Sequence, residues 1–232
     1  DSAISDMQVN LSDDPFNKLS DNTFIYLPAG NSIAPGPETK NVVIGSVCDN
    51  MEMDDSAPFE VAQDFIALDA KQTRTYTIGQ NATIYLPFAL NAETASGLGT
   101  FYKLAGIADG KVTMTSVDET DANTPYMFKP KETKVSAKLV KVKTLTSAPS
   151  TGDAHFIGTY NQESIVSTTT KQYYCFKASD GKFVHVINTP MTVDPFRAYV
   201  KVLGESLGRS LEIDTGDDVT AIKNIKVGTE DN

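Results

Sequence analysis

Short apolar runs separated by turn residues recur along the chain and predict β-strands. The clearest runs are 22–28, 41–47, 82–89 and 111–117, each flanked by Gly, Pro, Asn, Asp or Ser. Residues 111–117 alternate apolar and polar side chains, which is typical of a strand with one buried face. Residues 82–89 are apolar on both faces, which indicates a central strand that Pro87 must end or bulge.

Residues 134–145 alternate with a change of phase. Ala137 and Leu139 share one face with Val135, whereas Val140 and Val142 continue on the opposite parity. A one-residue phase change predicts a β-bulge. The four lysines of the segment would face solvent, as on an edge strand protected from aggregation. A strip that binds polyanions is the alternative, although no aromatic platform or arginine accompanies the lysines.

Residues 59–70 also fit a helix, because Val61, Phe65 and Ile66 lie near helical spacing and residues 55–58 offer capping side chains. Short apolar runs are compatible with either state. We expect a strand or an irregular loop here.

The sequence contains one internal repeat. Residues 101–130 and 173–202 each open with an aromatic pair, continue through Asp-Gly-Lys into an alternating run, and close on an aromatic strand. Asp-Gly, at 109–110 and 180–181, supplies the positive φ angles of a type I′ hairpin turn. The unit is therefore strand, hairpin, strand, loop, strand. Its period of about 71 residues exceeds that of solenoid or propeller repeats.

These patterns predict an all-β fold, an antiparallel β-sandwich built from two related strand-hairpin-strand halves with a smaller β-rich N-terminal segment. The excess of Thr and Val over Leu agrees with this class. We divide the chain into an acidic N-terminal segment or small subdomain at 1–75, the sandwich at 76–218 and a tail at 219–232.

The charge is acidic and unevenly spread. The 232 residues carry 30 acids and 20 bases, and 13 of these acids but only 4 of the bases lie in residues 1–75. This surplus argues against nucleic acid or an anionic membrane surface as partners. No apolar run approaches the roughly 20 residues of a membrane helix, so we expect no direct membrane insertion.

Candidate metal and redox residues are few. Cys48 and Cys175 lack metal-site spacing, and we expect two buried free thiols, although a disulfide remains open from sequence. The best calcium candidates are the acids at positions 49–55: Asp49, Glu52, Asp54 and Asp55. Asp214, Asp217 and Asp218 come second. Neither group has the spaced loop of a known calcium site, so we predict no metal and no cofactor.

Catalytic motifs are equally sparse. Asp-Thr-Gly at 214–216 matches the aspartic protease signature, but no second copy supplies the paired carboxylate. The two histidines, His155 and His185, lie in strand-like segments, and no nucleophile elbow is present. We expect a protein without catalytic residues that is not an enzyme.

Aromatic side chains offer the best candidate for ligand binding. Tyr173 and Tyr174 are adjacent on a predicted strand, so their rings point to opposite faces and one must face outward. An exposed ring is a platform on which a sugar can stack. Packing in the core or between strands is the other interpretation of each tyrosine.

A series of short motifs occurs in a fixed order between about 41 and 222. The motifs are Asn-Val-Val at 41–43, Asn-Met-Glu-Met-Asp-Asp at 50–55, Pro-Phe at 58–59, Thr-Arg-Thr-Tyr at 73–76, Ala-Thr-Ile-Tyr-Leu-Pro-Phe at 82–88, Ala-Asn-Thr-Pro-Tyr at 122–126, the Asp-Gly-Lys hairpin, Pro-Phe-Arg-Ala-Tyr at 195–199 and Leu-Glu-Ile-Asp at 211–214. In this order they resemble a C-terminal β-rich module of large secreted and surface proteins of the Bacteroidetes, which are adhesin-like and have no established activity.

The resemblance implies an extracytoplasmic, non-catalytic module at the cell surface or secreted. In those bacteria Asp-Ser followed by a small apolar residue can accept an O-linked glycan, so Ser56 is a possible acceptor, and Asp1-Ser2-Ala3 matches the same pattern. We expect a role in adhesion, assembly or spacing within a larger secreted protein, with a host or bacterial surface protein or glycan as partner. The alternative is a carbohydrate-binding accessory domain of a glycan-utilisation system.

Overall fold

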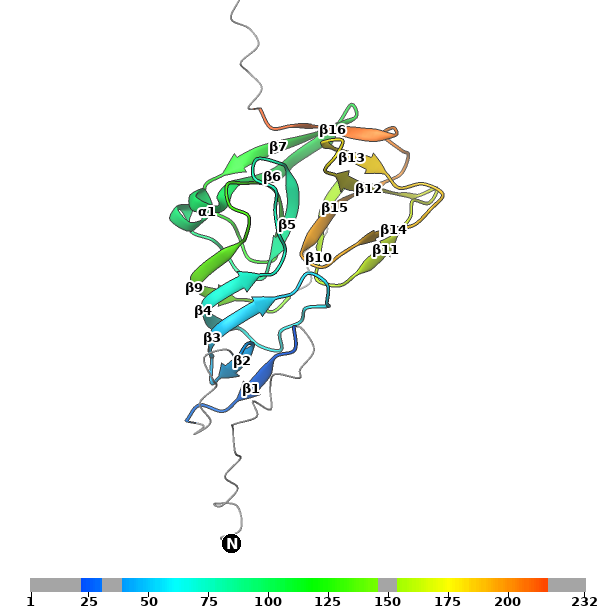
Figure 1. Ribbon diagram of the computed structural model, residues 1–232. Coiled ribbons are helices and arrows are strands. Elements are labelled where there is room, and N and C mark those ends of the chain that lie inside the picture. The colour runs from blue at the N-terminus through cyan, green and yellow to red at the C-terminus, as the bar shows by residue number, and fades with distance from the viewer. Residues whose placement is uncertain (1–21, 31–38, 146–153, 217–232) are drawn as a thin grey trace, which may run out of the picture.

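The computed structural model describes residues 22–30, 39–145 and 154–216 (Figure 1). Strands dominate these residues, and the predicted all-β class is confirmed. Three pairs of strands are parallel and the others antiparallel, so the two large sheets are mixed.

The first sheet has five strands in the order β1-β2-β3-β4-β9. They are β1 (Ile25–Leu27), β2 (Val42–Ile44), β3 (Val47–Met53), β4 (Phe65–Gln72) and β9 (Ser136–Val142). The strands of the acidic N-terminal segment are thus joined by one strand from the middle of the chain, because β9 pairs antiparallel with β4 at the edge of the sheet.

The second sheet has nine strands in the order β10-β15-β12-β13-β16-β7-β6-β8-β5. They are β5 (Ala82–Leu86), β6 (Gly99–Ala108), β7 (Lys111–Val117), β8 (Thr124–Pro130), β10 (Ala154–Thr159), β12 (Lys171–Lys177), β13 (Lys182–His185), β15 (Arg197–Leu203) and β16 (Ser210–Asp214). A two-stranded sheet joins β11 (Glu163–Ile165) to β14 (Met191–Val193), and α1 (Ala92–Leu98) connects β5 to β6.

The internal repeat is confirmed as two related halves of this sheet. In each half the first strand lies between its hairpin partner and the closing strand, giving β7-β6-β8 and β13-β12-β15. The outermost strands β5 and β10 extend the correspondence, since Ala154 begins β10 72 residues after Ala82 begins β5. Strand β16 lies between the corresponding strands β13 and β7, and it is antiparallel to β13 and parallel to β7. Corresponding strands of the two halves therefore run in opposite directions. A two-fold axis through β16, perpendicular to the sheet, would relate the halves in this way.

The nine-stranded sheet curls until its two ends nearly meet (Figure 1). The Tyr85 amide of β5 donates to the Phe196 carbonyl at 3.0 Å, and the Ala198 amide of β15 donates to Thr83 Oγ1 at 3.1 Å. A Cβ atom on Gly158 of β10 would lie 2.2 Å from the Tyr85 ring, so only glycine fits there. We call this junction of β5 with β10 and β15 the seam.

Three apolar cores hold these sheets together. One joins Met127 of β8 to Val200 of β15 and fills the interior of the curled sheet. The largest lies between the five-stranded sheet and the outside of the first half, where Phe65 and Phe128 belong to the same cluster, and this face-to-face packing is the sandwich. The third lies under the β11–β14 sheet.

The two Asp-Gly hairpins differ. Asp109 and Gly110 have φ of 50° and 71°, as the predicted type I′ turn requires. In the second hairpin Lys177 pairs with Lys182, and only Gly181 of the Asp-Gly pair has a positive φ, 67°. This loop has two more residues, so Asp180 does not need the left-handed conformation.

The strand predicted with a change of phase is β9, an edge of the five-stranded sheet as expected. The phase does change, but Leu139 is not on the buried face as predicted: Ala137, Val140 and Val142 are buried, whereas Leu139 is 72% exposed with φ of 54°. The lysines expected to face solvent do so at Lys134, Lys138 and Lys141, and Lys143 is half-buried.

Two local predictions have different outcomes. Residues 59–64 are irregular and β4 begins at Phe65, so the expectation of a strand or loop is confirmed. Helix α1 was not expected. Its signal is local, since Asn91 caps it by accepting from the Thr94 amide at 2.9 Å and Glu93 lies in the first turn.

Candidate functional site

The outer face of the five-stranded sheet carries large exposed apolar side chains from three neighbouring strands. They are Val47 of β3 (38% exposed), Ile66 (36%) and Leu68 (42%) of β4, and Leu139 of β9 (72%). Val47 and Ile66 are cross-strand partners. We call these four residues the outer patch. A contiguous apolar area of this kind marks an interaction site more often than isolated exposed leucines do.

The alternation of buried and exposed residues shifts by one position at the same level of β3, β4 and β9, and this shift creates the outer patch. On all three strands two successive residues between buried positions are partly or fully exposed: between Cys48 and Met51, between Ala67 and Ala70, and between Ala137 and Val140. The buried positions remain in register across the strands on both sides of this level. Two adjacent rows therefore face outward, which brings Leu68 and Leu139 to the same surface.

Leu139 combines two costs that folded proteins usually avoid. Its φ of 54° is in the left-handed region, which costs an L-residue roughly 1–2 kcal/mol. Its side chain also remains 72% exposed, so burial within the chain does not offset the strain. A bulky side chain held in this conformation on a surface is a reason to look for function there.

Charges of opposite sign flank the outer patch. On the β3 side lie Asp49 and Glu52, and on the β9 side lie the exposed Lys138 and Lys141. Lys138 is the cross-strand partner of Asp69. Glu52 pairs with Lys40, so Asp49 supplies the acidic charge at one margin and Lys138 and Lys141 supply the basic charge at the other.

A second candidate lies on the outside of the seam. It is a cleft of about 190 Å³, and its polar and apolar lining includes Arg74, Thr83, Phe176, Met191, Asp194 and Arg197. We call it the seam cleft. It brings together the segment before β5, the end of β12, the strand β14 and the start of β15.

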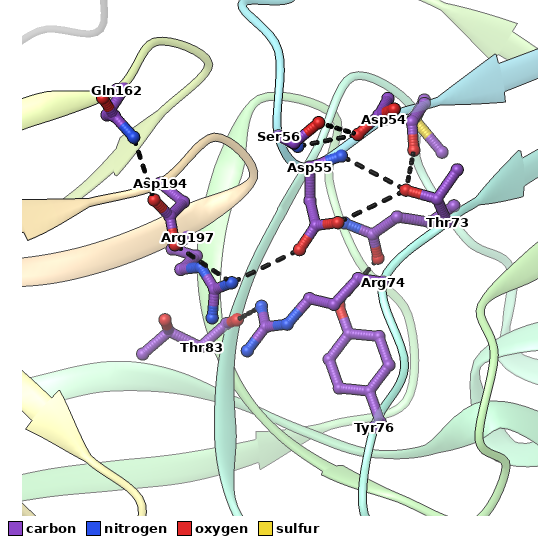
Figure 2. Close-up of polar contacts among 12 residues, drawn as sticks. Asp54, Asp55, Ser56, Thr73, Arg74, Tyr76, Thr83, Gln162, Asp194 and Arg197 are labelled. Atoms are coloured by element: carbon purple, nitrogen blue, oxygen red, sulfur yellow. Dashed lines mark hydrogen bonds and ion pairs between the residues drawn. The ribbon is translucent and has the colours of Figure 1, made fainter. Parts of the chain in front are cut away.

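Two arginines line the seam cleft, and their environments differ (Figure 2). Arg197 Nη2 lies 3.3 Å from Asp55 Oδ2 and 3.2 Å from Asp194 Oδ2, so two carboxylates balance its charge. Arg74 Nη1 donates to the Thr83 carbonyl at 2.7 Å, and its guanidinium lies 4.5 Å from the centre of the Tyr76 ring. Burial and then the nearby Arg197 charge lower the pKa of Arg74.

Three of the four calcium candidates at positions 49–55 have separate protein partners. Asp49 is exposed, Glu52 pairs with Lys40, Asp54 Oδ1 accepts from the Ser56 hydroxyl at 2.7 Å, and Asp55 pairs with Arg197. Across 22–30, 39–145 and 154–216, no group of three or more His, Cys, Asp or Glu is arranged to hold a metal ion. Of the second acidic group, Asp214 ends β16, and Asp217 and Asp218 lie outside the described residues.

Tyr173 and Tyr174 point to opposite faces of β12, as predicted. Tyr174 is fully buried in the interior of the curled sheet, so its ring cannot act as an exposed platform. Tyr173 is half-buried on the other face, where it packs against Tyr199 with ring centres 5.8 Å apart. Tyr174 is therefore not the exposed platform, and sugar stacking on Tyr173 stays a prediction.

His185 is held within a polar cluster. Its ring stacks on Tyr174 at 4.7 Å, Nε2 lies 3.0 Å from Gln172 Oε1 and Nδ1 lies 3.3 Å from Ser206 Oγ. Ser206 Oγ also contacts the Tyr174 hydroxyl and both backbone groups of Gly208. Burial lowers the pKa of His185. A serine with so many partners fixes the loop before β16 rather than presenting a free nucleophile.

Of the remaining predicted residues, Cys175 lines the seam cleft, and Cys48 and Ser56 lie outside both candidate sites. Cys48 and Cys175 are free and buried, as expected, and burial raises the pKa of each thiol to about 12. Ser56 is exposed in the turn after β3, which leaves glycosylation there a prediction. Asp1-Ser2-Ala3 lies outside the described residues.

Comparison with protein-family models gives no match, and comparisons with curated proteins and with solved structures give no significant match either. Within the described part of the chain, no helix is both long and apolar enough to span a membrane.

Sequence reasoning did not anticipate either candidate site. Arg74 and Arg197 meet only because the sheet curls. The one sequence signal that could have found the seam cleft is the scarcity of arginine, with three arginines among 20 basic residues. The structure places two of these three in the lining of the cleft. The outer patch was missed because Leu139 was placed on the buried face.

Proposed function

We propose that this chain is a non-catalytic assembly and adhesion module of a larger secreted or surface protein, and that it acts by protein contact through the outer patch. The observation that supports this most is Leu139, a strained and exposed leucine within an apolar surface. Contact with a partner would bury the side chain and offset the cost of its conformation.

A second copy of the chain is the partner that the charges favour. A two-fold axis parallel to the strands brings β3 of one copy opposite β9 of the other, because the rotation reverses the order of the strands. Asp49 of each copy then approaches Lys138 and Lys141 of its neighbour, with the apolar middles in contact. An axis perpendicular to the strands would instead place like charges opposite each other, which is unfavourable.

The location of the module is part of the same proposal. It rests on the resemblance to surface modules of the Bacteroidetes, and the exposure of Ser56 is what an O-linked glycan at that residue would require. Mass spectrometry of the chain from its native source tests this part, since a glycan on Ser56 requires passage through an extracytoplasmic pathway.

Self-association of the full chain tests the proposed contact. We expect sedimentation velocity to show a concentration-dependent dimer, weakened by Leu139→Asn and by high salt, because both apolar contact and charge pairing hold it. Ile78→Asn is the matched control, since Ile78 is 60% exposed but lies outside the outer patch.

Three outcomes would contradict the self-association proposal. They are a chain that stays monomeric at millimolar concentration, an equal effect of Ile78→Asn and Leu139→Asn, and a dimer that strengthens when Lys138 and Lys141 are both changed to Glu. The last change makes both margins acidic, so the proposed pairing predicts dissociation.

A further inference from the structure

Arginine is used sparingly in this chain. Of 20 basic residues only Arg74, Arg197 and Arg209 are arginines, and the others are lysines. Arg74 and Arg197 are 123 positions apart, yet both line the seam cleft, whereas Arg209 is exposed elsewhere. A guanidinium differs from an ammonium in its planar set of donors, which matches a carboxylate in a bidentate pair.

The two arginines of the seam cleft have different kinds of partner. Arg197 joins Asp55, in the turn after β3, to Asp194, before β15, so it fastens the five-stranded sheet to the seam. Arg74 makes no ion pair within the described residues. It contacts the Thr83 carbonyl and the Tyr76 ring face, neither of which carries a negative charge. A guanidinium stacked on a ring keeps its N–H edges available.

The rest of the cleft supplies a surface for the body of a ligand. Met191 is 39% exposed and lines the space beside Thr192 and Val193. The Phe176 ring instead packs against Phe183 in the interior of the curled sheet. At about 190 Å³ the cleft is smaller than the 300–1,000 Å³ of sites for drug-sized ligands. It therefore suits a small molecule, or one end group of a longer one.

We infer that the seam cleft binds a small organic carboxylate, with the carboxylate on Arg74 and the carbon skeleton on Met191. Arg197 pairs with Asp55 and Asp194 and so offsets the negative charge that these acids bring to the cleft. Two sources share this chemistry: a short-chain carboxylic acid and an acidic sugar. This binding is independent of the outer patch.

The test is titration of the full chain followed by amide nuclear magnetic resonance, with butyrate, glucuronate and glucose as separate probes. We expect the amides of Thr192 and Ala198 to shift with butyrate or glucuronate and not with glucose. Arg74→Gln should weaken this binding on the order of tenfold, because it removes the charged donor. Arg209→Gln, a matched change at an exposed arginine, should leave it unchanged.

The outcomes separate the sources and the alternatives. Tighter binding of butyrate assigns an aliphatic acid, and tighter binding of glucuronate assigns an acidic sugar, which would favour the carbohydrate-binding alternative. Shifts with glucose alone, no shift with either acid, or equal losses in the Arg74 and Arg209 variants would overturn the inference. If Arg74→Gln does not fold, Arg74→Lys keeps the charge without the planar donors, and unchanged affinity in that variant would overturn it as well.

Discussion

At the scale of single residues, the strained positions identify where this chain departs from an ordinary β protein. Leu139 and Phe196 both have positive φ, 54° and 61°. Phe196 is fully buried, and its ring packs against Phe59 and Tyr160 at the seam, so packing offsets the strain. Leu139 has no such compensation among the described residues, which is why we propose that it lies in a contact.

Leu139→Asn should therefore stabilise the isolated monomer even as it weakens self-association. Asparagine tolerates the left-handed region, so relief of strain should raise the free energy of unfolding by about 1 kcal/mol. Urea denaturation measures this free energy of unfolding, at a protein concentration low enough for the chain to be monomeric. Leu68→Asn is the control, since Leu68 lies on the same face without a positive φ and should bring no gain. A loss of stability in the Leu139 variant would contradict the argument from strain.

Single residues also mark the limit of prediction from sequence. Alternation identified Ala137, Val140 and Val142 correctly as residues on either side of a phase change. It could not identify Leu139 as the residue at which the phase changes, because leucine has no preference for positive φ and the apolar pattern fits either parity. The predicted β-bulge is absent, since the register of β4 with β9 is the same on both sides of Leu139. The meeting of Arg74 with Arg197 depends on closure of a sheet, which no local pattern encodes.

At the scale of elements, one carboxylate fastens the paired ends of β4 and β9. Asp64 precedes β4, and Lys143 and Thr144 follow β9. Asp64 Oδ2 lies 2.7 Å from Lys143 Nζ, and Oδ1 accepts from the Thr144 amide at 2.9 Å. The hydrogen bond from Lys143, followed by that from the Thr144 amide, lowers the pKa of Asp64 from 3.8 to about 2.

This lowered pKa makes the contribution of Asp64 depend on pH. A carboxylate with a lower pKa in the folded than in the unfolded chain stabilises the fold above pH 4, and this stabilisation is lost as pH falls through about 2. Asp64→Asn should thus lower the urea midpoint at pH 6, and the difference from the unchanged chain should shrink towards pH 2. Asp118→Asn, at an exposed position in the loop after β7 and outside the outer patch, is the control. A difference that stays constant from pH 6 to pH 2 would refute the assignment.

Elements were predicted best where their signal is local. The repeated hairpins follow from Asp-Gly between alternating runs, and the type I′ turn at Asp109-Gly110 from the same pair. The second hairpin has a different loop because the two strands end at Lys177 and Lys182, and pairing across a sheet decides where strands end. Helix α1 has a local signal in Asn91, but a helix of seven residues gives a weak periodic pattern.

At the scale of the molecule, closure of the nine-stranded sheet depends on one glycine. Gly158→Ala should destabilise the chain by about 3 kcal/mol, because the new methyl group would overlap the Tyr85 ring across the seam. Thermal or urea unfolding measures this. Gly106→Ala in β6 is the control, since a Cβ there meets no atom within 4 Å and should change stability little. Equal stability of both variants would show that Tyr85 can move aside.

The overall architecture was only partly predictable. The all-β class and the related halves followed from periodicity and from the repeat of 101–130 in 173–202. The sequence did not reveal that both halves belong to one sheet, or that β9 joins the N-terminal strands, because such pairings connect segments far apart in the chain. The limits of 1–75 and 76–218 stay a prediction.

The position of β16 has a consequence for how the chain is made. It is the last strand described, yet it lies at the centre of the nine-stranded sheet, between β13 and β7. During synthesis from the N-terminus, both halves therefore emerge before the strand that joins them. Until residues 210–214 arrive, each half presents an open edge to other chains, which is a route to aggregation. Folding of the chain must keep this interval short or cover those edges.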